Sequence, residues 1–167
     1  LECQTTRTPS TASAVRDGMR GDVRTLTPPP PRDVRRAMRA IVVRAPGDET
    51  ALVPADVPSP PLGPADVRIR VRATAVNRAD LLQRQGLYPP PPGASPLLGL
   101  ECAGTVLDVG AEVRGVTAGQ RVMALLPGGG YAEEAVVHHG SVMPVPDALS
   151  DDEAGAFPEV FLTAFSN

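Results

Sequence analysis

Residues 67–88 read VRIRVRATAVNRADLLQRQGLY, and this stretch determines the fold that we expect. In its first ten residues, apolar side chains alternate with arginines, which is the pattern of a β-strand with one buried and one solvent-facing side. Asn77 then stands at the position of a helix N-cap, and Gly86 is a residue type that ends helices. We therefore predict a strand over residues 67–76, followed by a short helix that begins at Asn77 and ends before Gly86.

Short strands and glycine turns dominate the residues on both sides of this stretch. Further strands are predicted over residues 38–43, 101–109, 120–126 and 131–137. Such a series is typical of a partly open β-barrel or a sandwich, and no segment alternates strands with long helices as a parallel sheet would. Ser150 and Glu153 form a capping box that begins a helical C-terminal stretch, which Pro158 breaks or kinks. The fold class that we expect is mainly β, with short helices.

The composition of the 167-residue chain excludes several classes of function. Residues 1–37 carry seven arginines against four acidic residues, whereas the whole chain has a net charge of −3. The body is therefore acidic, which argues against a nucleic-acid partner. No run of about 18 apolar residues is present, so no membrane partner is expected. Cys3 and Cys102 are too few for a disulfide framework, so a cytoplasmic location is predicted. Cys102 is expected to be packed in an apolar strand.

Residues 1–37 are expected to form a disordered N-terminal extension. They are rich in Thr, Ser, Pro and Arg, lack apolar periodicity and contain the proline run 28–31. Such a segment cannot bury enough apolar surface to become ordered. Two interpretations are open, namely an upstream extension with the natural start at Met38, or a transit peptide rich in arginine and hydroxyl residues. We favour the first, because a strand begins directly at Met38.

Several short motifs have structural explanations that outweigh functional ones. The glycines of 128–130 lack the third glycine of a dinucleotide-binding loop, and residues 99–104 have P-loop spacing but are followed by Thr105 where a lysine is needed. We interpret both as turn or close-packing glycines. His138 and His139 are adjacent, and on a strand they would point to opposite faces, so they are expected to be a surface pair that does not share a metal.

Five longer motifs resemble a known family. They are NRADLLQRQGLY (77–88), PGA (92–94), LGLECAG (98–104), MALLPGGG (123–130) and FPEVFLTAF (157–165). In these motifs the chain is similar to the medium-chain dehydrogenase/reductase superfamily, and within it to quinone oxidoreductases of the zeta-crystallin kind. The resemblance implies a chaperonin-10 (GroES)-like, partly open β-barrel as the catalytic domain over residues 38–158. It implies that residues 159–167 begin the helix toward a nucleotide-binding Rossmann domain that this sequence lacks, in a parent enzyme that is α/β overall.

The resemblance also implies an enzyme without zinc. Zinc-dependent members of the superfamily have a Cys at the position of Asn77, a His at that of Leu100 and a Glu at that of Glu101. A catalytic zinc needs thiolate, imidazole or carboxylate ligands, whereas an amide is a poor ligand and Leu100 has no lone pair. With only Cys3 and Cys102 in the chain, the four-cysteine structural zinc site is missing as well. We therefore predict no metal.

Without zinc, no Lewis acid polarises an isolated carbonyl. A conjugated acceptor such as a quinone or an enone is easier to reduce, because charge spreads to a distant oxygen as hydride arrives. The resemblance implies that Tyr88 is catalytic, as a donor to that oxygen, and that Asn77 and Thr163 contact the cofactor, NADPH or alternatively NADH. Other roles are open, since Tyr88 could only stack on the proline run 89–92 and Asn77 could only cap its helix.

The function that we expect is NAD(P)H-dependent quinone reduction, by a full-length enzyme that is a homodimer, as is usual in the resembled family. Two rivals are an enoyl reductase of the same superfamily, such as a polyketide-type module, and a non-catalytic barrel that acts as a binding module. Asp80 and Arg84 are expected to be structural, within a polar network. This chain alone is expected to be inactive, because it has no glycine-rich strand-to-helix turn for a pyrophosphate.

Overall fold

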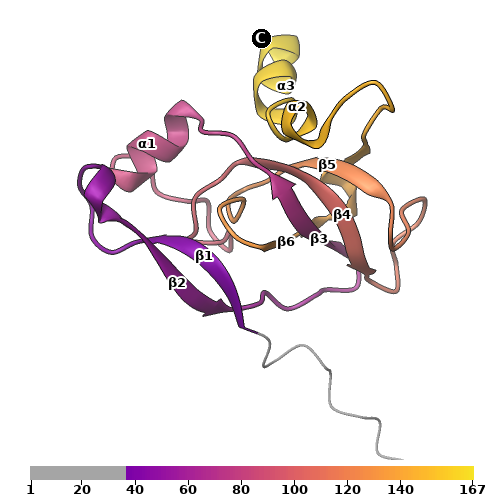
Figure 1. Cartoon of the computed structure of the whole chain (residues 1–167), viewed down its shortest axis with the longest axis horizontal. Coiled ribbons are helices and arrows are strands. Elements are labelled where there is room, and N and C mark those ends of the chain that lie inside the picture. The colour runs from indigo at the N-terminus through magenta and orange to yellow at the C-terminus, as the bar shows by residue number, and fades with distance from the viewer. Residues whose placement is uncertain (1–36) are drawn as a thin grey trace, which may run out of the picture. The chain divides into compact units, whose positions relative to one another are not determined.

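The computed structural model describes residues 37–167, so the predictions for residues 1–36 lie outside the described part of the chain. Within this part, seven strands form two sheets (Figure 1). The small sheet pairs β1 (Ala37–Val43) with β2 (Leu52–Pro58). The larger sheet has the order β6–β3–β4–β5–β7, with β3 at Asp66–Ala73, β4 at Glu101–Val109, β5 at Arg121–Leu125, β6 at Glu134–His138 and β7 at Val142–Pro144. All the strand pairs are antiparallel, which confirms the predicted mainly β class.

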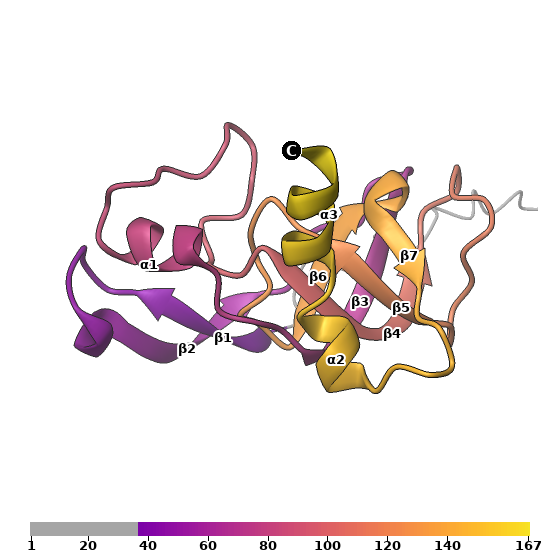
Figure 2. The ribbon, with the colours of Figure 1, turned by 90° about the horizontal axis from the view of Figure 1, so that it is seen from above.

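Contacts between β1 and the segment before β6 join the small sheet to the larger one. The Ile41 backbone N–H donates to the carbonyl of Tyr131 over 2.8 Å. Ala40 forms an isolated bridge with Ala132, and both Met38 and Ala40 are buried. The two sheets therefore form a partly open barrel rather than two separate layers (Figure 2).

Short helices complete the part of the chain that the structure describes. They are η1 (Glu49–Ala51), α1 (Arg78–Arg84), η2 (His139–Ser141), α2 (Asp151–Gly155) and α3 (Pro158–Ser166), of which η1 and η2 are 3-10 turns. Asn77 is the N-cap of α1, and Gly86 follows the helix with a φ of 77°, both as predicted. The C-terminal helical stretch is broken at Pro158, again as predicted. None of the helices among residues 37–167 is both long and apolar enough to cross a membrane.

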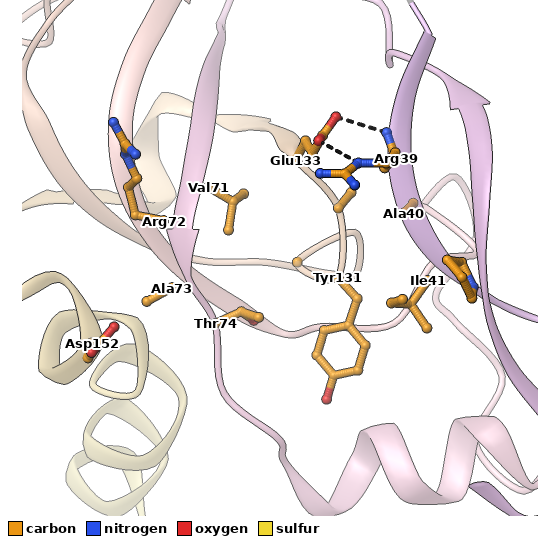
Figure 3. A pocket seen from close by; sticks show the side chains of 13 residues that line it. Arg39, Ala40, Ile41, Val71, Arg72, Ala73, Thr74, Tyr131, Glu133 and Asp152 are labelled. Carbon is orange, nitrogen blue, oxygen red and sulfur yellow. Dashed lines mark hydrogen bonds and ion pairs between the residues drawn. The ribbon is translucent and has the colours of Figure 1, made fainter. Parts of the chain in front are cut away.

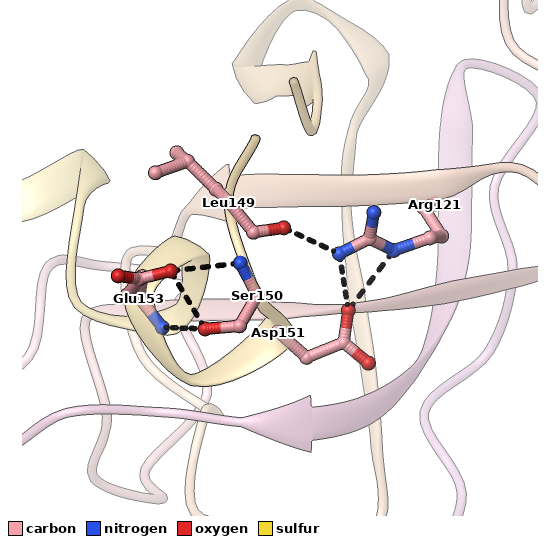
Figure 4. Close-up of polar contacts among 5 residues, drawn as sticks. All are labelled: Arg121, Leu149, Ser150, Asp151 and Glu153. Carbon is pink, nitrogen blue, oxygen red and sulfur yellow. Dashed lines mark hydrogen bonds and ion pairs between the residues drawn. The ribbon is translucent and has the colours of Figure 1, made fainter. Parts of the chain in front are cut away.

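The predicted capping box fixes the start of α2 (Figure 4). Ser150 Oγ accepts a hydrogen bond from the Glu153 backbone N–H over 3.2 Å, and the Glu153 carboxylate accepts one from the Ser150 backbone N–H over 2.9 Å. Arg121 of β5 reaches the same corner, where it donates to Asp151 Oδ1 and to the carbonyl of Leu149, both over 2.9 Å. These bonds attach the helical segment to the larger sheet.

The main core lies against the larger sheet and is built from small and branched side chains. Its buried members are Val67, Ile69, Cys102, Val106, Val113, Val122, Ala124, Leu126, Ala135 and Val137. Burial, followed by the neighbouring Glu101, raises the pKa of the Cys102 thiol to about 12. This cysteine is therefore packed, as predicted, and has little of the thiolate that reactive cysteines need. A second, smaller core joins α2 to β4 and β5.

The prediction that the arginines of β3 all face solvent is wrong at Arg68. Arg70 and Arg72 are exposed, but the Arg68 side chain is buried. Its guanidinium lies 3.3 Å from the Glu134 carboxylate of β6 and also donates to the Ser59 hydroxyl. A buried charge is tolerated when it is paired and hydrogen-bonded in this way. Alternation along one strand does not reveal which arginine has an acidic partner on the next strand.

The expectation that His138 and His139 point to opposite faces is also wrong. Strand β6 ends at His138, and His139 begins η2, so the alternation of a strand no longer applies. The two ring centroids lie 4.6 Å apart. His138 is exposed, and its Nδ1 accepts a hydrogen bond from the Gly140 backbone N–H. This histidine therefore has a structural role as the cap of η2.

The close approach of β3 and β4 at Gly104 gives a test of the sheet register. A Cβ at this position would overlap the backbone carbonyl of Arg70. We expect Gly104→Ala to lower the free energy of unfolding by about 3 kcal/mol, because the strands would have to separate. Gly47→Ala is the control, since its Cβ would find no atom nearer than 3.7 Å. Urea unfolding measures the stability of both variants. If Gly104→Ala and Gly47→Ala unfold at the same urea concentration, the register of β3 against β4 is contradicted.

Candidate functional site

A groove between α1 and α3 brings together residues that lie far apart in the sequence. Helix α1 lies beside the small sheet, and α3 stands over the larger one (Figures 1 and 2). The groove has a volume of about 520 Å³ and is lined by Asn77, Arg78, Ala79, Leu82, Tyr88, Glu159, Val160, Thr163 and Ala164. The structure thus places the three predicted site residues, Asn77, Tyr88 and Thr163, around one groove. Their roles stay predictions.

The groove is tied together underneath by the carboxylate of Glu101, a β4 residue that is fully buried. Glu101 Oε1 accepts a hydrogen bond from the Asn77 side-chain amide over 2.8 Å. Glu101 Oε2 accepts one from the backbone N–H of Glu159, in the first turn of α3, over 2.9 Å. Both bonds are charge-assisted because their acceptor is a carboxylate, and the N-terminal end of α3 also favours a negative charge beside it. One carboxylate therefore sets the position of α1 relative to α3.

Asp80 holds a second set of contacts behind the groove and is also buried. Its carboxylate accepts hydrogen bonds from the Asn77 backbone N–H over 2.9 Å and from the Gly99 backbone N–H over 2.8 Å. The first bond caps α1, and the second attaches the helix to the segment before β4. Asp80 is therefore structural, as predicted. Arg84 lies at the other end of α1, where its Nη1 is 4.0 Å from the Glu49 carboxylate.

Tyr131 is a polar residue of this network that the sequence analysis missed. Its hydroxyl lies 3.3 Å from Asp80 Oδ2 and 3.4 Å from the carbonyl of Ala75. Burial, then the negative charge of Asp80, raises the pKa of this phenol well above its usual range, so it stays neutral. Asp80 is 51 residues away in the sequence, and no local pattern around Tyr131 indicates such a contact.

Tyr131 also borders a second and more polar depression, with a volume of about 560 Å³ (Figure 3). Figure 3 shows the ion pair between Arg39 and Glu133 at one end of it, with Nε and Oε1 2.9 Å apart. Arg72 and Asp152 lie on the side toward α2. Both members of the ion pair are largely exposed, so the pair contributes little to stability. None of the predicted site residues lines this depression.

The residues at the zinc-ligand positions do not fit a zinc ion. The Asn77 amide nitrogen is occupied by its bond to Glu101, and Leu100 offers only an apolar side chain. Among residues 37–167, no three His, Cys, Asp or Glu side chains come together as a metal site. A zinc ion there would have a single carboxylate, which falls short of the three protein ligands of a catalytic site.

The same groove does fit the nicotinamide end of a dinucleotide. Asn77, Tyr88 and Thr163 supply amide and hydroxyl groups, while Leu82, Val160 and the alanines give apolar surface for a ring. Tyr88 is 43% exposed, so its ring is accessible from the groove. The glycine-rich stretch before β6 has a packing explanation, since a Cβ on Gly99 would overlap the backbone of Gly130. Close packing therefore accounts for these glycines, as expected from the sequence.

Comparison with known proteins identifies the family. The model of the alcohol dehydrogenase GroES-like domain matches residues 63–147, just over half of the chain. The chain belongs to this family. It is 42% identical over 99 residues to a component of the phenolphthiocerol/phthiocerol polyketide synthase of Mycobacterium tuberculosis, a match that covers 59% of this chain and 4% of that protein.

Two solved structures have the same fold. One is the human synaptic vesicle membrane protein VAT-1 homolog-like protein, at 37% identity and a TM-score of 0.72, over 78% of this chain and 42% of that one. The other is the quinone oxidoreductase from Coxiella burnetii, at 26% identity and a TM-score of 0.71, over 78% of this chain and 44% of that one. The predicted membership of the medium-chain dehydrogenase/reductase superfamily and the GroES-like fold are thus confirmed. The chain spans less than half the length of each of these relatives.

The Glu101 contacts generate a stability prediction. Glu101→Gln keeps one acceptor oxygen but places an NH₂ group against one of the two donors, the Asn77 amide or the Glu159 backbone N–H. We expect the free energy of unfolding to fall by about 1–3 kcal/mol, the usual cost of an unsatisfied buried polar group. Glu112→Gln, at an exposed position, is the matched control and should change it by less than about 0.5 kcal/mol. A variant as stable as the parent in urea would show that Glu101 does not tie the helices together.

Proposed function

We propose that this chain forms the acceptor-binding part of an NAD(P)H-dependent oxidoreductase that reduces quinones or related conjugated carbonyls without a metal. The observation that carries the proposal is the shared groove of Asn77, Tyr88 and Thr163. These residues come from the start of α1, the segment after it and α3, and the family resemblance in the sequence implies that each of them lies at the reaction site. The match to a quinone oxidoreductase structure supports the same class of acceptor.

The acceptor class follows from the groups that the groove offers. A zinc ion does not fit the site, so charge on the acceptor oxygen must be stabilised by hydrogen bonding. The Tyr88 hydroxyl, beside the groove and partly exposed, donates to that oxygen. A quinone or enone needs only this help, because conjugation spreads the charge that develops.

The cofactor side of the groove is assigned to Asn77 and Thr163. When bound, the reduced nicotinamide supplies the hydride. Asn77 is held by Glu101 through its amide nitrogen, so its side chain has a fixed orientation before any ligand binds. Thr163 lies on the groove side of α3, one turn beyond Glu159. NADPH is the cofactor that we propose, with NADH as the alternative.

We further propose a GroES-like catalytic domain over residues 38–158, with residues 159–167 leading toward a nucleotide-binding domain. Exposed apolar side chains on the last helix support this division. Val160, Phe161 and Phe165 are 56%, 55% and 92% exposed, a pattern that favours cover by another part of the protein. We also propose that the full-length enzyme is a homodimer and that it lies in the cytoplasm.

An enoyl reductase is the second candidate. The 42% identity to a polyketide synthase component favours it, and an enoyl thioester is also a conjugated carbonyl that needs no metal. The two candidates differ in the acceptor alone, because Asn77, Tyr88 and Thr163 would have the same roles in both. A barrel that binds a partner without catalysis remains the non-enzymatic alternative.

The deciding experiment uses protein expressed from the complete reading frame and purified without chelator. We expect NADPH oxidation with a quinone, slower turnover with an enoyl thioester, and far less than one zinc per chain. The 167-residue chain, assayed in parallel, should neither bind NADPH nor turn over, and should self-associate in gel filtration. Preference for the thioester would identify the protein as an enoyl reductase. One equivalent of zinc per chain would overturn the metal-free chemistry. Inactivity with all acceptors would favour the non-catalytic binding module.

Tyr88→Phe tests the donor in the same protein. We expect kcat for quinone reduction to fall by about 10²-fold or somewhat less, a usual loss for one donor, with unchanged affinity for NADPH. Tyr88→Leu removes the ring as well as the hydroxyl and separates donation from packing. If the Phe variant keeps full turnover and only the Leu variant is impaired, Tyr88 packs and does not donate.

A further inference from the structure

The reduction proposed above needs a proton as well as a hydride. Hydride addition to a quinone carries an electron pair to the acceptor and leaves a negative charge on its oxygen. A nearby acid must then deliver a proton to form the O–H bond of the hydroquinone. Among the described residues that line the groove, Glu159 is the one that carries a carboxyl group. It was not among the site residues predicted from the sequence.

Glu159 is held in a defined place at the base of α3. Its backbone N–H donates to Glu101 Oε2 over 2.9 Å, which fixes the root of the side chain. Pro158 precedes it as the first residue of the helix and is buried, so the backbone has little freedom to shift. The Glu159 side chain lines the groove together with Tyr88 and Thr163.

The electrostatic surroundings of Glu159 favour its protonated form. Partial burial, then the nearby carboxylates of Glu101 and Asp80, raise the pKa of the Glu159 carboxyl above its usual range. Arg78 also borders the groove, yet it makes no ion pair with Glu159 in the part of the chain that the structure describes. A carboxyl that holds its proton closer to neutral pH is suited to act as a general acid.

We propose that Glu159 is the catalytic proton donor of this reduction, an inference that rests on the proposed function. The acceptor gains the hydride and its electron pair, and the developing oxyanion takes the proton of the Glu159 carboxyl. The bond from that proton to Glu159 breaks as the O–H bond of the product forms, which leaves a carboxylate. A proton taken up from bulk solvent through the open groove then restores the Glu159 carboxyl, so each turnover consumes one hydride and one solvent proton. Tyr88 holds the same oxygen by a hydrogen bond, and the two groups act together.

The pH dependence of kcat in the complete protein tests the donor. Because the protonated form is active, kcat should be constant at low pH and fall as pH rises through the raised pKa of Glu159. Glu159→Gln should lower kcat by about 10²-fold and abolish this fall, with the KM for NADPH unchanged. The other titratable or charged groups that face Glu159 are Arg78, Asp80, Tyr88 and Glu101, and all are kept in this variant.

Asp152→Asn is the matched control, because it removes a similar charge at an exposed position of α2 outside the groove. It should keep both kcat and the pH profile. A second readout that needs no turnover is the titration of the Glu159 carboxyl carbon by NMR in the 167-residue chain, with Glu159→Gln used to assign the signal. The expected midpoint lies above the usual range of a glutamate carboxyl.

The outcomes separate this inference from the proposed function. A parent protein that reduces quinones, with a Glu159→Gln variant of equal kcat and the same pH profile, would overturn the donor and leave the proposed function intact. A parent protein inactive with every acceptor would overturn both. An ordinary midpoint for Glu159 in the NMR titration would overturn the inference whatever the activity.

Discussion

The arrangement of the groove depends on one buried carboxylate. Glu101 is removed from solvent, so its charge is tolerated only because the Asn77 amide and the Glu159 backbone N–H donate to it. These donors belong to α1 and α3, and loss of either would leave a buried charge poorly compensated. The sheet residue therefore specifies where both helices lie. Asp80 is a second buried carboxylate that joins two segments, because it accepts hydrogen bonds from the Asn77 backbone at the start of α1 and from the Gly99 backbone.

The absence of a metal site among residues 37–167 has a physical explanation that goes beyond missing ligands. Where zinc-dependent members of the resembled superfamily have a thiolate, this chain has an amide whose nitrogen already donates to Glu101. The acidic residue that remains is thereby satisfied by hydrogen bonds and has no need of a cation. The groove offers an amide, two hydroxyls, a carboxyl and the Arg78 guanidinium, and such groups would suit the proposed acceptors, whose own conjugation stabilises charge.

Features set by local chemistry were predictable from the sequence, and those set by distant partners were not. The cap at Asn77, the stop at Gly86 and the capping box at Ser150 follow from short-range rules. The placement of Asn77, Tyr88 and Thr163 came from motifs that resemble a family. The burial of Arg68 and the contact of Tyr131 with Asp80 escaped prediction, since each depends on a partner more than 50 residues away.

The short connection between α2 and α3 has a consequence for changes in chain length. Gly155 is pressed against Ala73 of β3, where a Cβ would overlap the strand, and only two residues separate it from the start of α3 at Pro158. The start of α3 is also bonded to Glu101 through the Glu159 backbone N–H. An insertion in this connection would strain that bond and displace Thr163 from the groove, whereas the exposed turn around Gly115 has open space around it. Homologues should therefore vary in length at that turn and keep the α2–α3 connection constant.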